Sequence, residues 1–282
     1  MKKLLLLLAI LLTTGCSLVK DNLEDAKINT TVYPIQYLTE KLYGNYSTSQ
    51  SIYPIGADIT NYELTEKQIK NYAKSDLFIY NGLSNEKNIA KNLINQNKNL
   101  LIIDVSYGLN YTHGMEELWM SPNNYLMLAK NIKDNLIEYL KSKYIIQEVE
   151  KNYEQLAESL SLMDADLRAI GKDAKTKGKN TLIVNDNLFK YLENYGFNII
   201  SLDPETVTDT TLENTKNAFK KKTYDTLIIL DDNISDEIDS IITEYKAKTI
   251  EVSSMLYKAE EDDDYVAQMQ AFIDSIRNLS LK

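Results

Sequence analysis

The chain has 282 residues, of which 44% are hydrophobic and 26% are charged, and its formal net charge is -10. This composition is ordinary for a globular protein, and the length is sufficient for two domains of average size. A nucleic-acid partner is disfavoured, because phosphate contacts need a concentrated basic face and the one obvious basic run, 220–222, is typical of a solvated helix end. A single cysteine excludes an internal disulfide and a zinc finger.

Residues 1–16 have the pattern of an export signal. Lys2 and Lys3 precede the apolar run 4–12, and small residues lead to Cys16. This pattern indicates a signal peptide rather than a membrane span. Because Cys16 directly follows a glycine, as in a bacterial lipobox, we predict a mature chain that begins at Cys16 with a lipid on its sulfur; the alternative is a plain signal peptide with an incidental cysteine. Residues 17–26 would form a tether to the outer surface of the cell membrane.

Strands and helices alternate through 27–121, which we predict to be an N-terminal α/β lobe. The β-branched and apolar runs predict strands at 28–33, 51–54, 77–80 and 100–105, and the patterns between them predict helices at 34–42, 65–74 and 85–96. The segment 107–121 is expected to be a loop, and Pro122 to open a further helix to about residue 141. Short connections between alternating strands and helices predict a parallel sheet with right-handed crossovers.

The same scheme returns in 176–282, which we predict to be a C-terminal α/β lobe. After a turn at 171–180, strands are expected at 181–184, 198–202, 226–230 and 248–252, with helices at 186–195, 210–221, 235–245 and 263–278. Each half therefore has about four parallel strands. Ligands of open parallel sheets lie beyond the carboxyl ends of the strands. We therefore expect an interlobe cleft lined by the loops 56–63, 81–85, 107–121, 185–187, 203–209 and 231–233.

Between the lobes, 122–175 is predicted to be a helical linker that contains one long helix. Apolar residues recur there at alternating spacings of three and four, the stripe of one helical face. They are Ile146, Val149, Tyr153, Leu156, Leu160, Met163, Leu167 and Ile170. A two-helix coiled coil is the alternative. Because the sequence differs on the two sides of the stripe, we predict an α/β fold of two lobes joined by a rigid backbone helix at 146–170.

Several motifs occur in an order that resembles one family. They are Tyr33-Pro34 after the first strand, Gly56-Ala57-Asp58 with Tyr62-Glu63 in the next loop, Asp76-Leu77-Phe78-Ile79-Tyr80-Asn81-Gly82, Leu118-Trp119-Met120-Ser121-Pro122, and Phe189-Lys190-Tyr191 with Tyr195-Gly196. Together they resemble the cluster A-I solute-binding lipoproteins of zinc- and manganese-importing ABC transporters. The resemblance implies an extracytoplasmic binding protein, monomeric and not an enzyme, that docks on a membrane permease. Hydrolase, phosphate-loop and zinc-protease motifs are absent from the sequence.

The family's metal-ligand positions carry unusual residues in this chain. The resemblance places the first ligand position on Thr60, the second on Glu117, the third on Asp186 or, in another register, Asn185, and the last on Asp263 or, in other registers, Asp262 or Asp264. The only histidine, His113, lies four residues before Glu117. Structural roles remain open for several of these residues, since Asp186 is well placed to cap a helix and Thr60 is a poor ligand that is compatible with a lost site.

A set of metal ligands that contains only oxygen atoms changes the cation that we expect the protein to bind. Zinc prefers thiolate and imidazole, whereas carboxylates suit Mn²⁺, Ca²⁺ or Mg²⁺. The expected cation is therefore Mn²⁺, Ca²⁺ or Zn²⁺, or none. Carboxylates that face one cleft repel each other, so at least one is expected to have a raised pKa. Two alternatives stay open: a metal-independent surface protein for adhesion or accessory contacts, and a binding protein for another small cationic solute.

Overall fold

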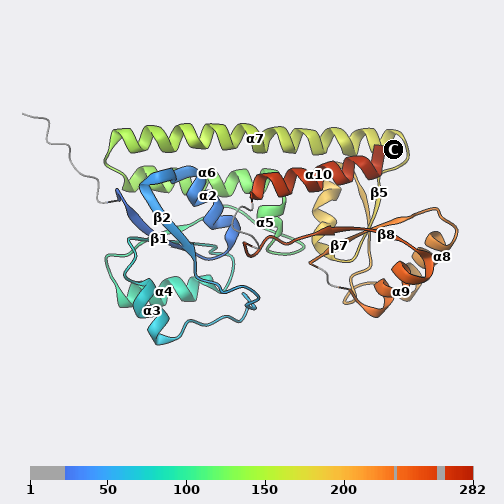
Figure 1. Ribbon diagram of the computed structural model, residues 1–282, viewed down its shortest axis with the longest axis horizontal. Helices are drawn as coiled ribbons and strands as arrows, with labels where there is room; N and C mark the ends of the chain where they lie inside the picture. Colours follow the sequence, from blue (N-terminus) through green and yellow to red (C-terminus); the bar gives the residue numbers. More distant parts are fainter. Residues whose placement is uncertain (1–22, 232–233, 259–263, 282) are drawn as a thin grey trace, which may run out of the picture.

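The structure, a computed structural model, describes residues 23–231, 234–258 and 264–281. It has two four-stranded parallel sheets, each flanked by helices, and one long helix that runs along both (Figure 1). This confirms the predicted fold class. The strand order is β2-β1-β3-β4 in the first sheet and β6-β5-β7-β8 in the second, so the two lobes have the same topology.

In the first lobe, the apolar strands predicted at 77–80 and 100–105 are confirmed, whereas the strand predicted at 28–33 ends at Thr30 and Tyr33 already begins a helix. The strands are β1 (Ala26–Thr30), β2 (Ser47–Ser51), β3 (Leu77–Tyr80) and β4 (Leu101–Asp104), and the helices are α2 (Tyr33–Tyr43), the 3-10 turn η1 (Gly44–Tyr46), α3 (Glu66–Tyr72) and α4 (Glu86–Gln96). Thr65 and Gln68 form the expected capping box before α3. The predicted strand at 51–54 is wrong. Its place is taken by β2, a polar edge strand with no apolar pattern to reveal it.

The start of the first lobe also differs from the prediction. Residue 26, the last of the predicted tether, is the first of β1, and Leu23 is already buried. Tyr43 fixes this start, because its hydroxyl donates to the Leu23 carbonyl oxygen at 2.7 Å. Folded structure therefore begins by residue 23, a few residues earlier than the sequence indicates.

The second lobe follows its predicted order closely. It contains β5 (Thr181–Val184), η2 (Asn187–Tyr195), β6 (Asn198–Ser201), α8 (Asp209–Lys220), β7 (Thr226–Leu230), α9 (Asp236–Tyr245), β8 (Lys248–Val252) and α10 (Tyr265–Leu281). The helix expected at 186–195 is a 3-10 helix, capped by the Asp186 side chain and ended by Gly196 in a left-handed conformation. The predicted strands at 181–184, 226–230 and 248–252 are confirmed.

The segment 107–121, expected to be a loop, ends in a short helix, α5 (Glu117–Met120), which closes the first lobe, and the linker contains α6 (Pro122–Tyr139) and α7 (Lys143–Thr176). The long helix α7 has 34 residues, about 51 Å at 1.5 Å per residue. It extends beyond the predicted 146–170 at both ends, so the turn expected from residue 171 is wrong. Gly171 does not end the helix. Instead it permits close packing, because a Cβ there would lie 1.9 Å from the Tyr195 carbonyl oxygen of η2.

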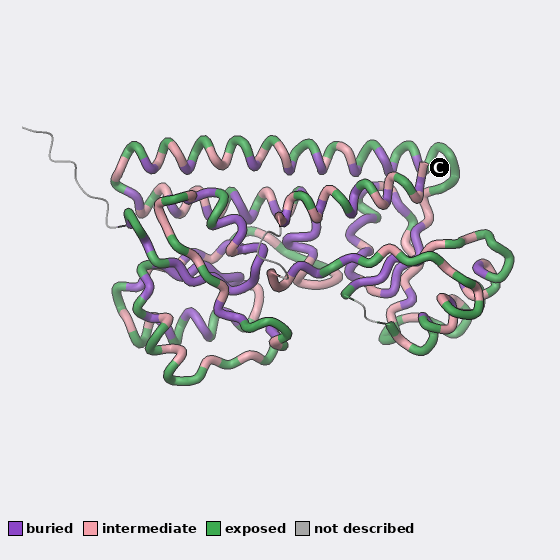
Figure 2. Tube along the Cα trace, viewed as in Figure 1, coloured by how far each residue is buried: buried purple, intermediate pink, exposed green. Residues whose placement is uncertain are grey.

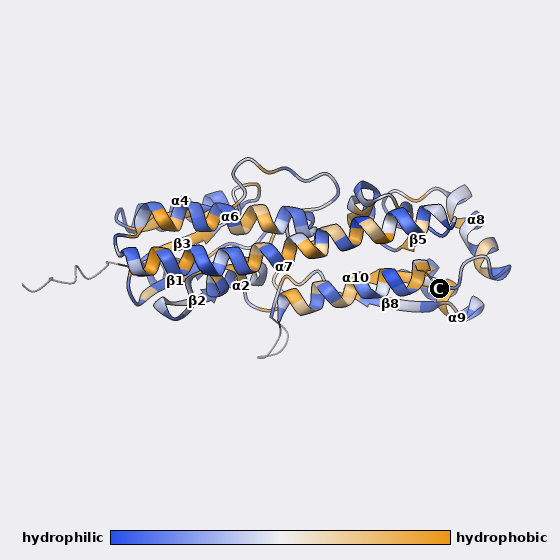
Figure 3. Cartoon of the chain, turned by 90° about the horizontal axis from the view of Figure 1, so that it is seen from above, coloured by the Kyte–Doolittle hydropathy of each residue, from blue (hydrophilic) through white to orange (hydrophobic). Residues whose placement is uncertain are grey.

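Helix α7 supports both lobes through one face. Its buried residues recur every three or four positions, among them Val149, Leu160 and Ile170, and Figure 2 shows the buried turns on the side toward the lobes. Seen from above, α6 lies beside its first half and α10 beside its second half (Figure 3). Because both lobes pack on the same helix, large movements of one lobe against the other are restricted.

The segment that follows β8 returns to the first lobe and fastens the two lobes together. Trp119 is fully buried, and its indole nitrogen donates to the Ser254 carbonyl oxygen at 2.9 Å. The Tyr33 amide donates to the Leu256 carbonyl oxygen at 3.1 Å. The Tyr265 hydroxyl, at the start of α10, donates back to the Trp119 carbonyl oxygen at 2.6 Å. The tryptophan therefore has the structural role of an interlobe anchor.

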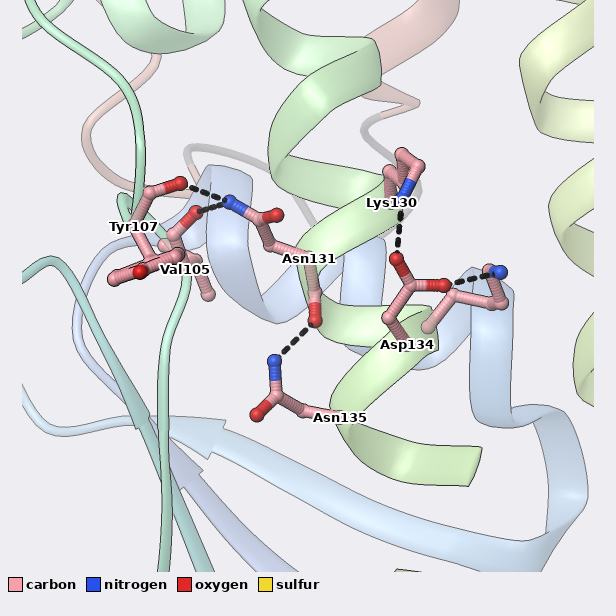
Figure 4. Close-up of polar contacts among 7 residues, drawn as sticks. Val105, Tyr107, Lys130, Asn131, Asp134 and Asn135 are labelled. Atoms are coloured by element: carbon pink, nitrogen blue, oxygen red, sulfur yellow. Dashed lines mark hydrogen bonds and ion pairs between the residues drawn. The ribbon is translucent and has the colours of Figure 1, made fainter. Parts of the chain in front are cut away.

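Helix α6 also fixes the start of the long loop that follows β4. The Asn131 side-chain amide donates to the carbonyl oxygens of Val105, at 2.7 Å, and Tyr107, at 2.9 Å (Figure 4). One turn on, Asn135 bonds to the Asn131 carbonyl oxygen, and Asp134 pairs with Lys130. The loop thus leaves the sheet from a fixed point. Among the described helices, none has a stretch apolar and long enough for a bilayer crossing.

Candidate functional site

The loops at the carboxyl ends of the two sheets meet between the lobes. Gly114, in the loop before α5, lies against η2, since a Cβ there would be 3.2 Å from the Leu188 side chain. The Tyr257 hydroxyl, after β8, donates to the Ala57 carbonyl oxygen in the first lobe. The loop 107–121 therefore faces the second lobe as expected, whereas 56–63 contacts the segment that returns from β8; the polar residues of these loops form the candidate site.

Thr60 lies in an exposed part of the loop after β2. Its hydroxyl and its amide both donate to one carboxylate oxygen of Asp58, the amide at 2.9 Å, and Asn61 donates to the other oxygen at 2.8 Å. The hydrogen bond from the Thr60 side chain is the main reason that the pKa of Asp58 lies below its usual value. The anionic group here is Asp58, and Thr60 holds it in place.

Glu117 is the first residue of α5 and is 7% exposed. One of its carboxylate oxygens accepts the amides of Thr112, at 3.1 Å, and His113, at 3.3 Å. A carboxylate with two backbone donors of this kind organises a loop. Glu117 therefore shapes the path of 112–116 toward the second lobe, and the half-buried His113 is held by its backbone.

Asp186 and Asn185 follow β5 at the carboxyl end of the second sheet. One oxygen of Asp186 accepts the Leu188 amide at 2.7 Å and caps η2. Burial raises the pKa of Asp186, and the nearby carboxylates of Asp203 and Asp231 add to the rise. Asn185 is buried, and its side-chain oxygen accepts the Leu230 amide at 2.9 Å, so it joins β5 to β7.

Two carboxylates that the family register does not indicate, Glu116 and Asp231, lie near enough to Asp186 to interact with it electrostatically. Burial raises the pKa of Glu116, and the charges of Asp186 and Asp231 raise it further. Asp231 directly follows β7 in a left-handed conformation and accepts the Ser254 amide at 2.6 Å. Two carboxylates of the second lobe thus interact electrostatically with a carboxylate of the first lobe. Asp231 could be found from its place after a predicted strand, whereas Glu116 is hidden by its neighbour Glu117.

The last predicted ligand position is described by the structure in only one of its registers. Asp263, like Asp262, lies outside the described residues. Asp264 accepts hydrogen bonds from the Tyr37 hydroxyl at 2.9 Å, the Lys41 ammonium at 3.1 Å and the Ala267 amide at 3.0 Å. Although burial acts in the opposite direction, these donors hold the pKa of Asp264 below its usual value. Asp264 therefore fastens the start of α10 to α2.

Within residues 23–231, 234–258 and 264–281, no three side chains of His, Cys, Asp or Glu are grouped closely enough to hold a metal ion. Asp231 raises the pKa of both Glu116 and Asp186, and Asp186 raises that of Glu116, but these three carboxylates do not lie close enough together to coordinate one ion.

Two α/β lobes on one helix, with carboxylates where the sheets' carboxyl ends meet, define a two-lobed solute-binding protein. Comparison with known proteins places the chain more narrowly. Residues 28–279 match the family model described as "Zinc-uptake complex component A periplasmic". The chain therefore belongs to the ZnuA family of substrate-binding proteins of metal-importing ABC transporters, which are transport proteins rather than enzymes.

Individual relatives agree with this assignment. The metal ABC transporter substrate-binding lipoprotein SsaB of Streptococcus sanguinis is 27% identical to the chain, over 98% of each sequence. The solved structure of the metal-dependent lipoprotein YcdH from Bacillus subtilis has a TM-score of 0.74 and 21% identity, covering 91% of this chain and all of that one. Zn(II)-bound AdcA from Streptococcus pneumoniae, with a TM-score of 0.72 and 19% identity, is longer: 92% of this chain spans 58% of AdcA.

Proposed function

We propose that this chain is the lipid-anchored, extracytoplasmic binding component of an ABC importer, and that it carries a divalent cation bound mainly by carboxylate oxygens between its lobes. One observation supports this most: burial raises the pKa of the first-lobe Glu116 carboxyl, and the charges of Asp186 and Asp231 of the second lobe raise it further. A cation placed among these three carboxylates would relieve their repulsion.

The proposed ligands refine those expected from the family register. Asp186 keeps its proposed role, and Asp263, which lies outside the described residues, stays a proposed ligand on the ground of the sequence alone. Glu116 supplies the first-lobe carboxylate, because Glu117 is engaged with the amides of Thr112 and His113. Thr60 and His113 have supporting roles in their loops. Oxygen ligands of this kind suit Mn²⁺ or Ca²⁺ better than Zn²⁺, in contrast to the relative AdcA, which was solved with Zn(II) bound.

Binding requires a small rearrangement. Among the described residues no three carboxylates are grouped closely enough for an ion, and we propose that the loop 112–116 or the lobes approach each other when the cation binds. Helix α7 packs against both lobes and limits this approach to a modest shift. Cation binding would then lock the closed arrangement, which is the form expected to dock on the permease. Lipid on Cys16 would hold the protein, as a monomer, beside that permease.

Calorimetric titration of the metal-free, full-length protein with Mn²⁺, Ca²⁺ and Zn²⁺ tests this proposal. We expect micromolar or tighter binding of Mn²⁺ or Ca²⁺. Asp186→Asn keeps an acceptor for the Leu188 amide, since Asn is also a good helix cap, but removes the charge. We expect it to weaken binding about tenfold or more. Glu154→Gln removes one charge from the exposed face of α7 and is the matched control.

Two outcomes would contradict the proposal. No micromolar binding of any of the three ions would remove metal carriage and leave a metal-independent surface role on the same fold. Equal weakening by Asp186→Asn and by Glu154→Gln would show that bulk charge, rather than the proposed site, attracts the cation.

A further inference from the structure

A concentration of lysines lies at the far end of the second lobe, where the strands of its sheet begin. Three turns meet there: the end of α7 with the residues after it, the end of α8, and the end of α9 with the start of β8. All of the lysines in these turns are exposed. The lysine cluster consists of Lys175, Lys177, Lys179, Lys220, Lys221, Lys222, Lys246 and Lys248.

Contacts between the turns make the lysine cluster one surface. The Lys222 ammonium donates to the Tyr245 carbonyl oxygen, and the Lys248 ammonium pairs with Asp225 at 2.8 Å. A hollow of about 500 Å³ lies between the first two turns, with Lys179 on one side and Lys222 with Asp225 on the other. Lys179 and Lys222 thus line one hollow, and Lys248 is joined to its edge through Asp225.

The surface is strongly positive although the whole chain has a net charge of -10. The segments 173–179, 220–226 and 244–248 contain three carboxylates, Asp173, Asp225 and Glu244, against eight lysines. Asp225 is already paired with Lys248. Like charges gathered in this way repel each other and raise the energy of the folded state unless an anion lies among them.

Helix dipoles explain only part of this arrangement. A lysine near a helix C-terminus interacts favourably with it, which accounts for Lys175 and Lys220 in the last turns of α7 and α8. The ammonium groups of Lys177 and Lys222 likewise donate to the last carbonyl oxygens of α10 and α9. The last turns of α4 and α6, by contrast, contain no basic residue. Lys179 and Lys248 stand before or at the start of strands, where no helix dipole favours them.

We propose that the lysine cluster binds a linear polyanion that carries repeated phosphate groups. Lysine ammonium groups act as point charges for phosphate, and eight of them spread over three adjoining turns match a chain of repeated anions better than a single ion.

A membrane surface fits less well. The large exposed apolar side chains of the described residues, such as Ile55, Tyr107 and Leu162, all lie outside the cluster, so nothing there would insert into lipid. The cluster also lies at the opposite end of α7 from β1, where the described chain begins (Figure 1). That helix is about 51 Å long. Because this is many times the Debye length of about 8 Å at physiological salt, charges at the β1 end of the molecule are screened from the lysine cluster.

The test uses the full-length protein in a non-ionic detergent, with inorganic polyphosphate as the probe. We expect binding whose affinity falls steeply as salt is raised, because counterions are released. The double variant Lys179→Glu with Lys221→Glu should bind at least tenfold more weakly and show a shallower salt dependence. Lys67→Glu with Lys70→Glu, on exposed α3 of the first lobe, changes the net charge equally and should bind within about twofold of the unchanged protein.

Thermal unfolding of each variant checks that it is folded, and Lys179→Gln with Lys221→Gln replaces the glutamate pair if that pair is not. Equal loss of polyphosphate binding in the cluster and control variants would overturn the proposal, as would absence of binding to the unchanged protein. Binding to phosphatidylglycerol vesicles without binding to polyphosphate would also overturn it and assign the surface to the membrane.

Discussion

The buried carboxyl of Glu86 provides a sharp test of how the cleft loops are supported. Glu86 is the first residue of α4 and is 1% exposed. Its carboxylate accepts the Asn81 amide at 2.6 Å, which fixes the loop 81–85 at the carboxyl end of β3. Burial raises the pKa of Glu86 from 4.5 to about 7, although the hydrogen bond from the Asn81 amide acts in the opposite direction.

The sign of the pH dependence follows from this shift. Between pH 4.5 and pH 7 the folded state binds the Glu86 proton more tightly than the unfolded state does. The contribution of Glu86 to the free energy of unfolding is therefore fully present below pH 4.5 and is lost as the pH rises through 7. A shift of this size corresponds to about 3 kcal/mol, of which about 2–3 kcal/mol falls between pH 5 and pH 8.

The variant Glu86→Gln keeps the shape and the acceptor for the Asn81 amide but cannot ionise. Urea unfolding at a series of pH values gives the free energy of unfolding of both proteins. Relative to the variant, the unchanged protein should lose about 2–3 kcal/mol between pH 5 and pH 8. Glu154→Gln, on the exposed face of α7, serves as the control. A difference between the unchanged protein and Glu86→Gln that stays constant with pH would refute the argument.

Two further substitutions test the packing that positions the lobes. Gly171→Ala forces α7 and η2 apart, because the new Cβ would lie 1.9 Å from the Tyr195 carbonyl oxygen. We expect it to lower the free energy of unfolding by about 1–3 kcal/mol. The control, Ser161→Ala on the exposed face of α7, should change the free energy of unfolding by less than about 0.5 kcal/mol. Trp119→Phe leaves the buried Ser254 carbonyl oxygen without its indole donor. We expect it to lower the free energy of unfolding, measured with denaturant, by about 1–3 kcal/mol. No change for either substitution would contradict the close packing between the lobes.

The sequence predicts the strands well where apolar runs are continuous and buried, as in 77–80 and 226–230. It fails for β2, because a polar edge strand has no apolar face and its pairing with β1 comes only from the folded sheet. It also fails at Gly171. A glycine near the end of an apolar stripe suggests a helix end, whereas here the glycine serves the close approach of another segment.

The candidate site is predicted in its loops but less well in its side chains. Glu116 and Glu117 are adjacent on the chain, and successive residues at the start of a helix point about 100° apart, so sequence alone does not tell which one faces the second lobe. The hydrogen bonds of Glu117 decide this. Likewise, 220–222 looks like an isolated helix end until the fold brings 175–179 and 246–248 beside it.

The central claim is that a divalent cation lies between the lobes in a cage of carboxylates. The most direct test is anomalous diffraction at the manganese absorption edge from crystals of the full-length protein grown with Mn²⁺. The account predicts one strong peak in contact with the carboxylate of Asp186 and with a glutamate of the first-lobe loop. A peak that contacts neither lobe's carboxylates, or no peak in crystals that contain the metal, would contradict it.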